Sequence, residues 1–166
     1  MGYGVTAYRV DLELLSATFK HPSKEVRDKA IVAGMSKHCN NSAIVKELVE
    51  EGKAASGDLG QEYFYAIEGI ISTIGTFLPA RKWSPIEIDA YGKLETDFQN
   101  LDSFLSVTIP EPDDFPWVLA LPRTAMTKEL SAKIQSELAD GGLFEEFQKW
   151  IAEATENNQD LVLYLY

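Results

Sequence analysis

The residue types most suited to chemistry or recognition gather in one acidic, aromatic segment, residues 111–117 (EPDDFPW). Two prolines stiffen this segment, three carboxylates crowd it and two aromatic side chains accompany them. A rigid acidic loop with an aromatic anchor suits contact with a basic protein, because opposite charge speeds the encounter and a buried ring holds the complex. The expected partner-binding residues are Glu111, Asp113, Asp114, Phe115 and Trp117.

Two other interpretations of this segment stay open. It is a structural crossover if Phe115 and Trp117 lie in the core, and its acids then only face water. It is a cation site if the carboxylates converge on a hard metal ion, although the twelve-residue calcium-loop pattern is missing.

A second candidate lies on the longest predicted helix, where Glu62, Tyr65 and Glu68 are three residues apart. That spacing places them on the side of the helix away from its apolar stripe. Paired carboxylates act as acid and base when one of them is desolvated, whereas exposed glutamates only solvate a surface. We expect Glu62, Tyr65 and Glu68 to line a pocket only if this helix is buried on all sides.

Two further patterns do not support catalysis. Gly52 and Gly57 are spaced as in a phosphate-binding loop, but Asp58 follows where that loop requires lysine. His38 and Cys39 are adjacent, and neighbours on a helix point about 100° apart, so adjacency alone makes no thiol–imidazole pair. We expect no catalytic residue, no metal site and no cofactor.

The elements that must position these residues are mainly helical. Apolar, β-prone runs at the two ends of the chain predict strands that pair with each other, and a third strand is expected from 104–109 or 116–121. The predicted order is a strand over 3–10, helices within 11–98, an acidic, proline-rich connection over 99–123, helices over 127–140 and 143–155, and a strand over 161–166. These elements predict an α+β fold, a mainly helical single domain (1–166) with a small sheet formed by the N- and C-terminal strands.

Two helices have clear sequence signals. The apolar period predicts the central helix from Asp58 to about Leu78. Ser84, Pro85 and Glu87 combine an N-cap serine, a first-turn proline and a third-position glutamate, so another helix is expected to open there.

Charge is distributed unevenly along the 166 residues. The net charge is −11, and residues 84–166 hold sixteen acidic and five basic residues, which accounts for the whole excess. This field argues against nucleic acid and anionic membranes as partners and favours a basic protein. A lone cysteine, no signal-peptide pattern and no long apolar stretch predict a cytoplasmic protein.

The two ends of the chain resemble the YfbM-like family of small bacterial proteins. The similar segments are 144–150 (FEEFQKW) with Ala152 and Ala154, 160–166 (DLVLYLY), and the opening 2–5 (GYGV) and 8–12 (YRVDL). The resemblance implies a mainly helical α+β fold with a sheet made from both termini. It carries over no catalytic residue.

The leading hypothesis is a small acidic, bacterial-type protein-binding module, such as an immunity or inhibitor partner of a basic protein. Small acidic proteins often have such roles, which is an association and not a derivation from these residues. The alternatives are an enzyme or small-ligand-binding protein with an unrecognised site, and a homodimeric structural protein. Monomer and homodimer both remain open.

Overall fold

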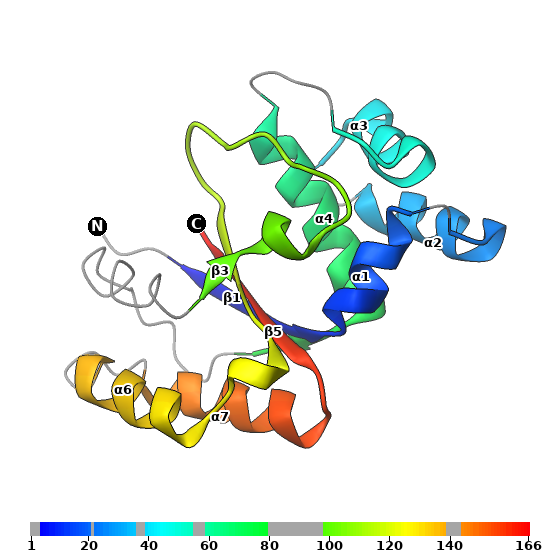
Figure 1. Cartoon of the computed structure of the whole chain (residues 1–166). Helices are drawn as coiled ribbons and strands as arrows, with labels where there is room; N and C mark the ends of the chain where they lie inside the picture. The colour runs from blue at the N-terminus through cyan, green and yellow to red at the C-terminus, as the bar shows by residue number, and fades with distance from the viewer. Residues whose placement is uncertain (1–3, 21, 36–38, 55–58, 80–97, 139–143) are drawn as a thin grey trace.

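The structure is a computed structural model that describes residues 4–20, 22–35, 39–54, 59–79, 98–138 and 144–166 (Figure 1). Its strands are β1 (Val5–Val10), β2 (Thr76–Leu78), β3 (Gln99–Asn100), β4 (Trp117–Leu121) and β5 (Asp160–Leu165). Its α-helices are α1 (Leu12–Thr18), α2 (Lys24–Gly34), α3 (Ser42–Lys46), α4 (Gly60–Ile74), α6 (Lys128–Leu138) and α7 (Phe144–Glu156). Shorter helical turns are the π-helical η1 (Glu47–Glu51) and the 3-10 turns η2 (Leu101–Phe104) and η3 (Arg123–Ala125).

The strands form one antiparallel sheet in the order β2-β1-β5-β4-β3. β5 is the central strand, and its register with β1 runs from Val5 opposite Leu165 to Val10 opposite Asp160. The prediction that the two ends of the chain pair in a mainly helical α+β domain is therefore confirmed. The strands are β1 and β5 with the bounds given above, against the predicted 3–10 and 161–166.

Helices cover both faces of the sheet. The helices α1 to α4 lie on one side of the sheet, where Ile67 of α4 and Tyr164 of β5 belong to the same core cluster. The helices α6 and α7 lie on the other side (Figure 1), where Phe147, Trp150 and Leu163 belong to a second core cluster. All six residues of β5 are buried, which explains why this strand is apolar without alternation.

The central helix α4 ends four residues before the predicted end at Leu78. Its last N–H bond runs from Gly75 to the carbonyl oxygen of Ile71, and residues 76–78 then form β2 against β1. A Cβ on Gly75 would lie 2.6 Å from the carbonyl oxygen of Arg9, so the chain can turn this close to β1 only at a glycine. The helical prediction for residues 75–78 was wrong. The apolar positions in this stretch fit a helix and a strand equally well, and pairing with β1 favours the strand.

The connection predicted over 99–123 contains regular structure. It holds β3, η2, β4 and η3, and β4 coincides with the expected third strand at 116–121. The alternative strand at 104–109 is not formed. The predicted helix that opens at Ser84 lies outside the described residues, and the helices predicted over 127–140 and 143–155 are α6 and α7.

The carboxylate of Asp160 joins three elements where β5 begins. It accepts hydrogen bonds from the backbone N–H groups of Leu12 (2.9 Å) and Arg123 (2.8 Å), and the Arg123 Nε lies 3.2 Å away. Arg123 also pairs with Asp11 at 3.3 Å and donates to the carbonyl oxygen of Asn158 at 2.6 Å. The buried carboxylate of Asp160 and its half-buried partner Arg123 therefore fix the start of α1 and the start of η3, two residues after β4, onto the central strand.

Candidate functional site

The acidic segment 111–117 lies on the surface with its carboxylates in water. Glu111, Asp113 and Asp114 are all exposed. Among the described residues, no lysine or arginine forms an ion pair with any of the three. Their charges are therefore not neutralised within the described part of the fold.

The same segment is held at both ends. On one side its backbone lies against the start of α4, since a Cβ on Gly60 would overlap the carbonyl oxygen of Pro110. On the other side Pro116 is buried and Trp117 begins β4, opposite Leu165. Figure 1 shows this stretch arching from η2 past the start of α4 and back to β4.

The two aromatic side chains of the segment form a pair. The ring centroids of Phe115 and Trp117 are 4.9 Å apart, with 39° between the ring planes. Both residues are half-buried, and Trp117 packs against the core on the α6 and α7 side of the sheet. The expectation that these rings lie in the core, as in a purely structural crossover, therefore applies to only part of each ring. The exposed part of the pair presents apolar surface beside three exposed carboxylates.

The second candidate group does not form one pocket. Its member Glu68 is buried, with 8% of its surface exposed, although the expected position was on a solvated face. Tyr8 donates a 2.9 Å hydrogen bond to Oε1 of Glu68, and Tyr166 donates one to Oε2. Residues 66–71 of α4 are all buried, so the helix is covered on all sides at Glu68 but not at the half-buried Tyr65.

The tyrosines around Glu68 have raised pKa values because they are buried and lie close to a carboxylate. Burial raises the pKa of Tyr8 above its ordinary value of 10.0, and the charge of Glu68 and its hydrogen bond add to the effect. The pKa of Tyr166 rises for the same reasons, burial first. Burial also raises the pKa of Tyr164, whose hydroxyl donates to the carbonyl oxygen of Phe64 at 3.1 Å. These phenols therefore stay protonated as donors at neutral pH.

We expect the tyrosine cluster to make the fold sensitive to alkali. A raised pKa in the folded state contributes stability that is fully present below the ordinary tyrosine pKa of 10.0 and is lost as pH rises above it. Each such tyrosine lowers the free energy of unfolding by up to about 1.4 kcal/mol per pH unit in that range. Denaturant unfolding at pH 8 to 11 measures this slope, and it should be shallower in Tyr166→Phe. An unchanged slope in that variant would contradict the assignment.

Glu62 and Tyr65 have neighbours other than the Glu68 carboxylate. Glu62 lines an open, polar hollow of about 390 Å³ with Asn40, Asn41 and Ser42. Tyr65 accepts a 3.1 Å hydrogen bond from Gln61, and its ring stacks parallel to that of Tyr166. The structure thus connects Tyr65 with Glu68 through Tyr166 and leaves Glu62 on another surface.

The thiol of Cys39 is buried near the Glu62 hollow. Burial raises its pKa, and the negative charge of Glu62 adds to that rise. A thiol in these surroundings is a poor nucleophile, because the thiolate is the reactive form. Its sequence neighbour His38 lies outside the described residues.

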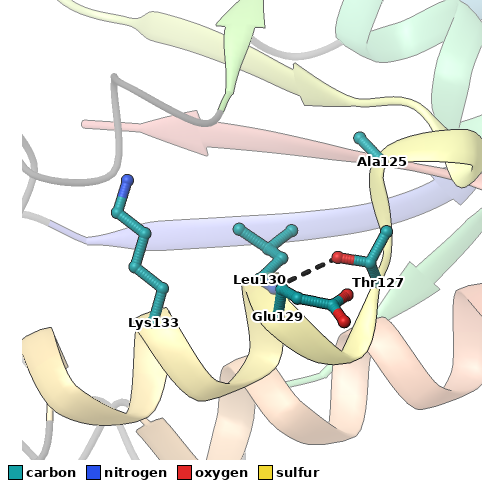
Figure 2. Close-up of a pocket in the computed structure, with 5 residues that line it drawn as sticks. All are labelled: Ala125, Thr127, Glu129, Leu130 and Lys133. Atoms are coloured by element: carbon teal, nitrogen blue, oxygen red, sulfur yellow. Dashed lines mark hydrogen bonds between the residues drawn. The ribbon is translucent and has the colours of Figure 1, made fainter.

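Another hollow, of about 290 Å³, lies at the start of α6. Figure 2 shows its lining side chains, with Thr127 accepting the backbone N–H of Leu130 at 3.2 Å to cap the helix. Glu129 and Lys133 are its charged members. The hydroxyl oxygen of Thr127 is thus engaged as a helix cap.

The described residues hold neither a metal-ligand cluster nor a membrane-spanning helix. Within these residues, no group of three or more His, Cys, Asp or Glu side chains is arranged to hold a metal ion. No helix in the described part of the chain has the length and apolarity required to cross a membrane.

Comparison with known proteins places the chain in a family. The family model of a domain of unknown function, DUF7691, matches residues 1–166. The chain belongs to the DUF7691 family. No curated protein and no solved structure matches the chain. The resemblance of the chain ends to the YfbM-like family stays a prediction.

Sequence reasoning missed two features that the fold assembles. The first is the donor pair Tyr8 and Tyr166, which no local spacing links to Glu68. The second is the ion pair of Arg123 with Asp160. One signal was available for Asp160: a charged residue directly before an apolar run of strand length needs a partner if that strand is buried.

Proposed function

We propose that this DUF7691 protein is a binding module for a basic protein, which it engages through the 111–117 loop. The observation that carries the proposal is the combination of three exposed carboxylates, none in an ion pair with a described residue, and the half-buried ring pair of Phe115 and Trp117. Aromatic anchors supply much of the binding free energy at interfaces, and surrounding charges set the association rate and the choice of partner.

The anchoring of the loop supports the same function. Its contact with Gly60 and the insertion of Trp117 into β4 order this surface before any partner arrives. A pre-ordered surface loses less conformational entropy on binding than a flexible tail does. The negative charge of residues 84–166 extends the attraction beyond the loop, as an inhibitor or immunity protein would require.

The test is capture from a lysate of cells that make the protein, at about 50 mM and about 500 mM salt. The Debye length exceeds about 10 Å at the lower concentration and falls well below about 10 Å at the higher one, so charge attraction is screened there. The baits are the wild type, Asp113→Asn/Asp114→Asn and the matched control Glu145→Gln/Glu156→Gln, which neutralises two exposed acids of α7. We expect one basic protein near 1:1 with the wild type and the control at low salt, and a loss of at least about ten-fold with the loop variant. Equal capture by the two variants, or no specific capture, would contradict the proposal.

A further inference from the structure

Glu68 is a buried carboxylate whose hydrogen-bond partners are neutral. Its two oxygens accept from the hydroxyls of Tyr8 and Tyr166, and among the described residues no basic side chain forms an ion pair with it. Moving a carboxylate out of water costs several kcal/mol unless a positive charge or several donors compensate it. An ionised carboxylate has about four acceptor positions, and two hydroxyl donors fill only half of them. Glu68 therefore keeps capacity for a cationic donor.

The two tyrosines that donate to this carboxylate belong to a group of four neighbouring tyrosine rings. The rings of Tyr65 and Tyr166 lie nearly parallel, 8° apart in orientation, with centroids separated by 6.3 Å. The ring of Tyr164 lies 6.3 Å from that of Tyr166, and its edge meets the ring of Tyr8 at 6.1 Å. Aromatic faces attract cations, and the attraction grows where water is excluded. Several rings near one carboxylate are the chemistry that recognises an ammonium group.

The cluster lies at the margin of the interface between α4 and the sheet. Tyr65 and Tyr166 are half-buried, and Glu68 retains 8% of its surface. Tyr166 directly follows Leu165, which is the residue opposite Trp117 in the sheet. Tyr166 is thus at the end of the sheet where the acidic loop enters β4.

We propose that Glu68, with the rings of Tyr65 and Tyr166, binds an alkylammonium group. The ammonium N–H groups would donate to the carboxylate oxygens while the alkyl chain and the charge rest against the rings. This proposal goes beyond the loop-binding function and rests on different residues, so either can fail without the other.

The test is a titration of the folded protein with n-butylammonium, followed by NMR chemical shifts, with n-butanol as the neutral control of equal chain length. We expect saturable shifts that include the ring resonances of Tyr65 and Tyr166 and are missing with n-butanol. Glu68→Gln keeps the shape and one acceptor oxygen but removes the charge, so its affinity should be at least about ten-fold lower. Glu62→Gln, the matched control on the same helix, should bind as the wild type does.

A second variant guards against loss of the fold in Glu68→Gln. Tyr65→Leu removes a half-buried ring and leaves the carboxylate and its two donors in place, so we expect at least about three-fold weaker binding. The absence of saturable shifts would overturn the proposal. So would equal binding of n-butanol, or unchanged affinity in a folded Glu68→Gln or Tyr65→Leu protein.

Two sources can supply an alkylammonium group, a free amine or the lysine side chain of a protein. A tripeptide with acetylated and amidated ends and a central lysine separates them from n-butylammonium. Tighter binding of the peptide supports the lysine of a partner, and tighter binding of n-butylammonium supports a free amine. The same peptide with an acetylated lysine side chain should not bind, and equal binding of that peptide would overturn the proposal.

Discussion

Replacing Asp160 with alanine is expected to lower the free energy of unfolding by about 3–5 kcal/mol, because two backbone N–H groups and the Arg123 guanidinium lose the carboxylate that they share. The Asp160 side chain is 5% exposed and that of Arg123 is 27% exposed. Without the carboxylate, the N–H groups of Leu12 and Arg123 lose their acceptor in a buried environment. The effect should be large because one side chain connects α1, η3 and β5.

Substituting the other partner of the ion pair, alone and together with Asp160, gives a sharper test than Asp160→Ala alone. Arg123→Ala should cost clearly less than Asp160→Ala, because Asp160 still accepts from the two backbone N–H groups. The double variant should cost much less than the sum of the two, since the residues act as one unit. Chemical denaturation of the three proteins measures this. Additive losses, or a larger loss for Arg123→Ala, would contradict this account of the ion pair.

The second large effect is expected at Gly69, where α4 crosses α2. A Cβ on Gly69 would overlap the backbone carbonyl oxygen of Ala33 and would lie 3.1 Å from the Cα atom of Gly34, both on α2. Backbone atoms cannot rotate away, so Gly69→Ala must push the two helices apart. Alanine normally stabilises a helix by about 1 kcal/mol over glycine. We nevertheless expect a net loss of about 2–3 kcal/mol, because overpacking of a close contact outweighs that gain.

A matched control lies on the same helix. Ser72→Ala changes an exposed residue of α4 and should alter the free energy of unfolding by no more than about 0.5 kcal/mol. Thermal and denaturant unfolding of both variants provide the measurement. A Gly69→Ala protein as stable as the wild type would show that α2 and α4 do not approach as closely as described.

The fold was predictable from the sequence where the residues of a segment are compatible with only one kind of secondary structure and burial. The apolar run at 161–166 leaves no polar face, so a covered position in a sheet follows from composition alone. Its pairing with the N-terminal strand followed because two apolar strands at opposite ends need partners. The end of α4 was not predictable in this way, because Phe77 and Leu78 fit the helical period as well as they fit β2.

The two candidate sites also differ in how far they could be predicted from the sequence. The acidic loop is local in sequence, so its composition could be interpreted directly, and the structure adds its exposure and its anchoring. The Glu68 cluster depends on hydroxyl groups 60 and 98 residues away along the chain. A helical wheel places Glu68 relative to the apolar stripe of its own helix only. It contains no information on the strands that cover the other side.

The most direct test of the proposed function is site-specific photo-cross-linking. A benzoylphenylalanine at position 115 places the reactive group inside the proposed contact surface. The same group at position 32 of α2, where Val32 is 76% exposed, serves as the control. We expect irradiation in cells to give one adduct with a basic protein from position 115 and none from position 32. An adduct from position 32 alone, or from neither position, would contradict binding through the 111–117 loop.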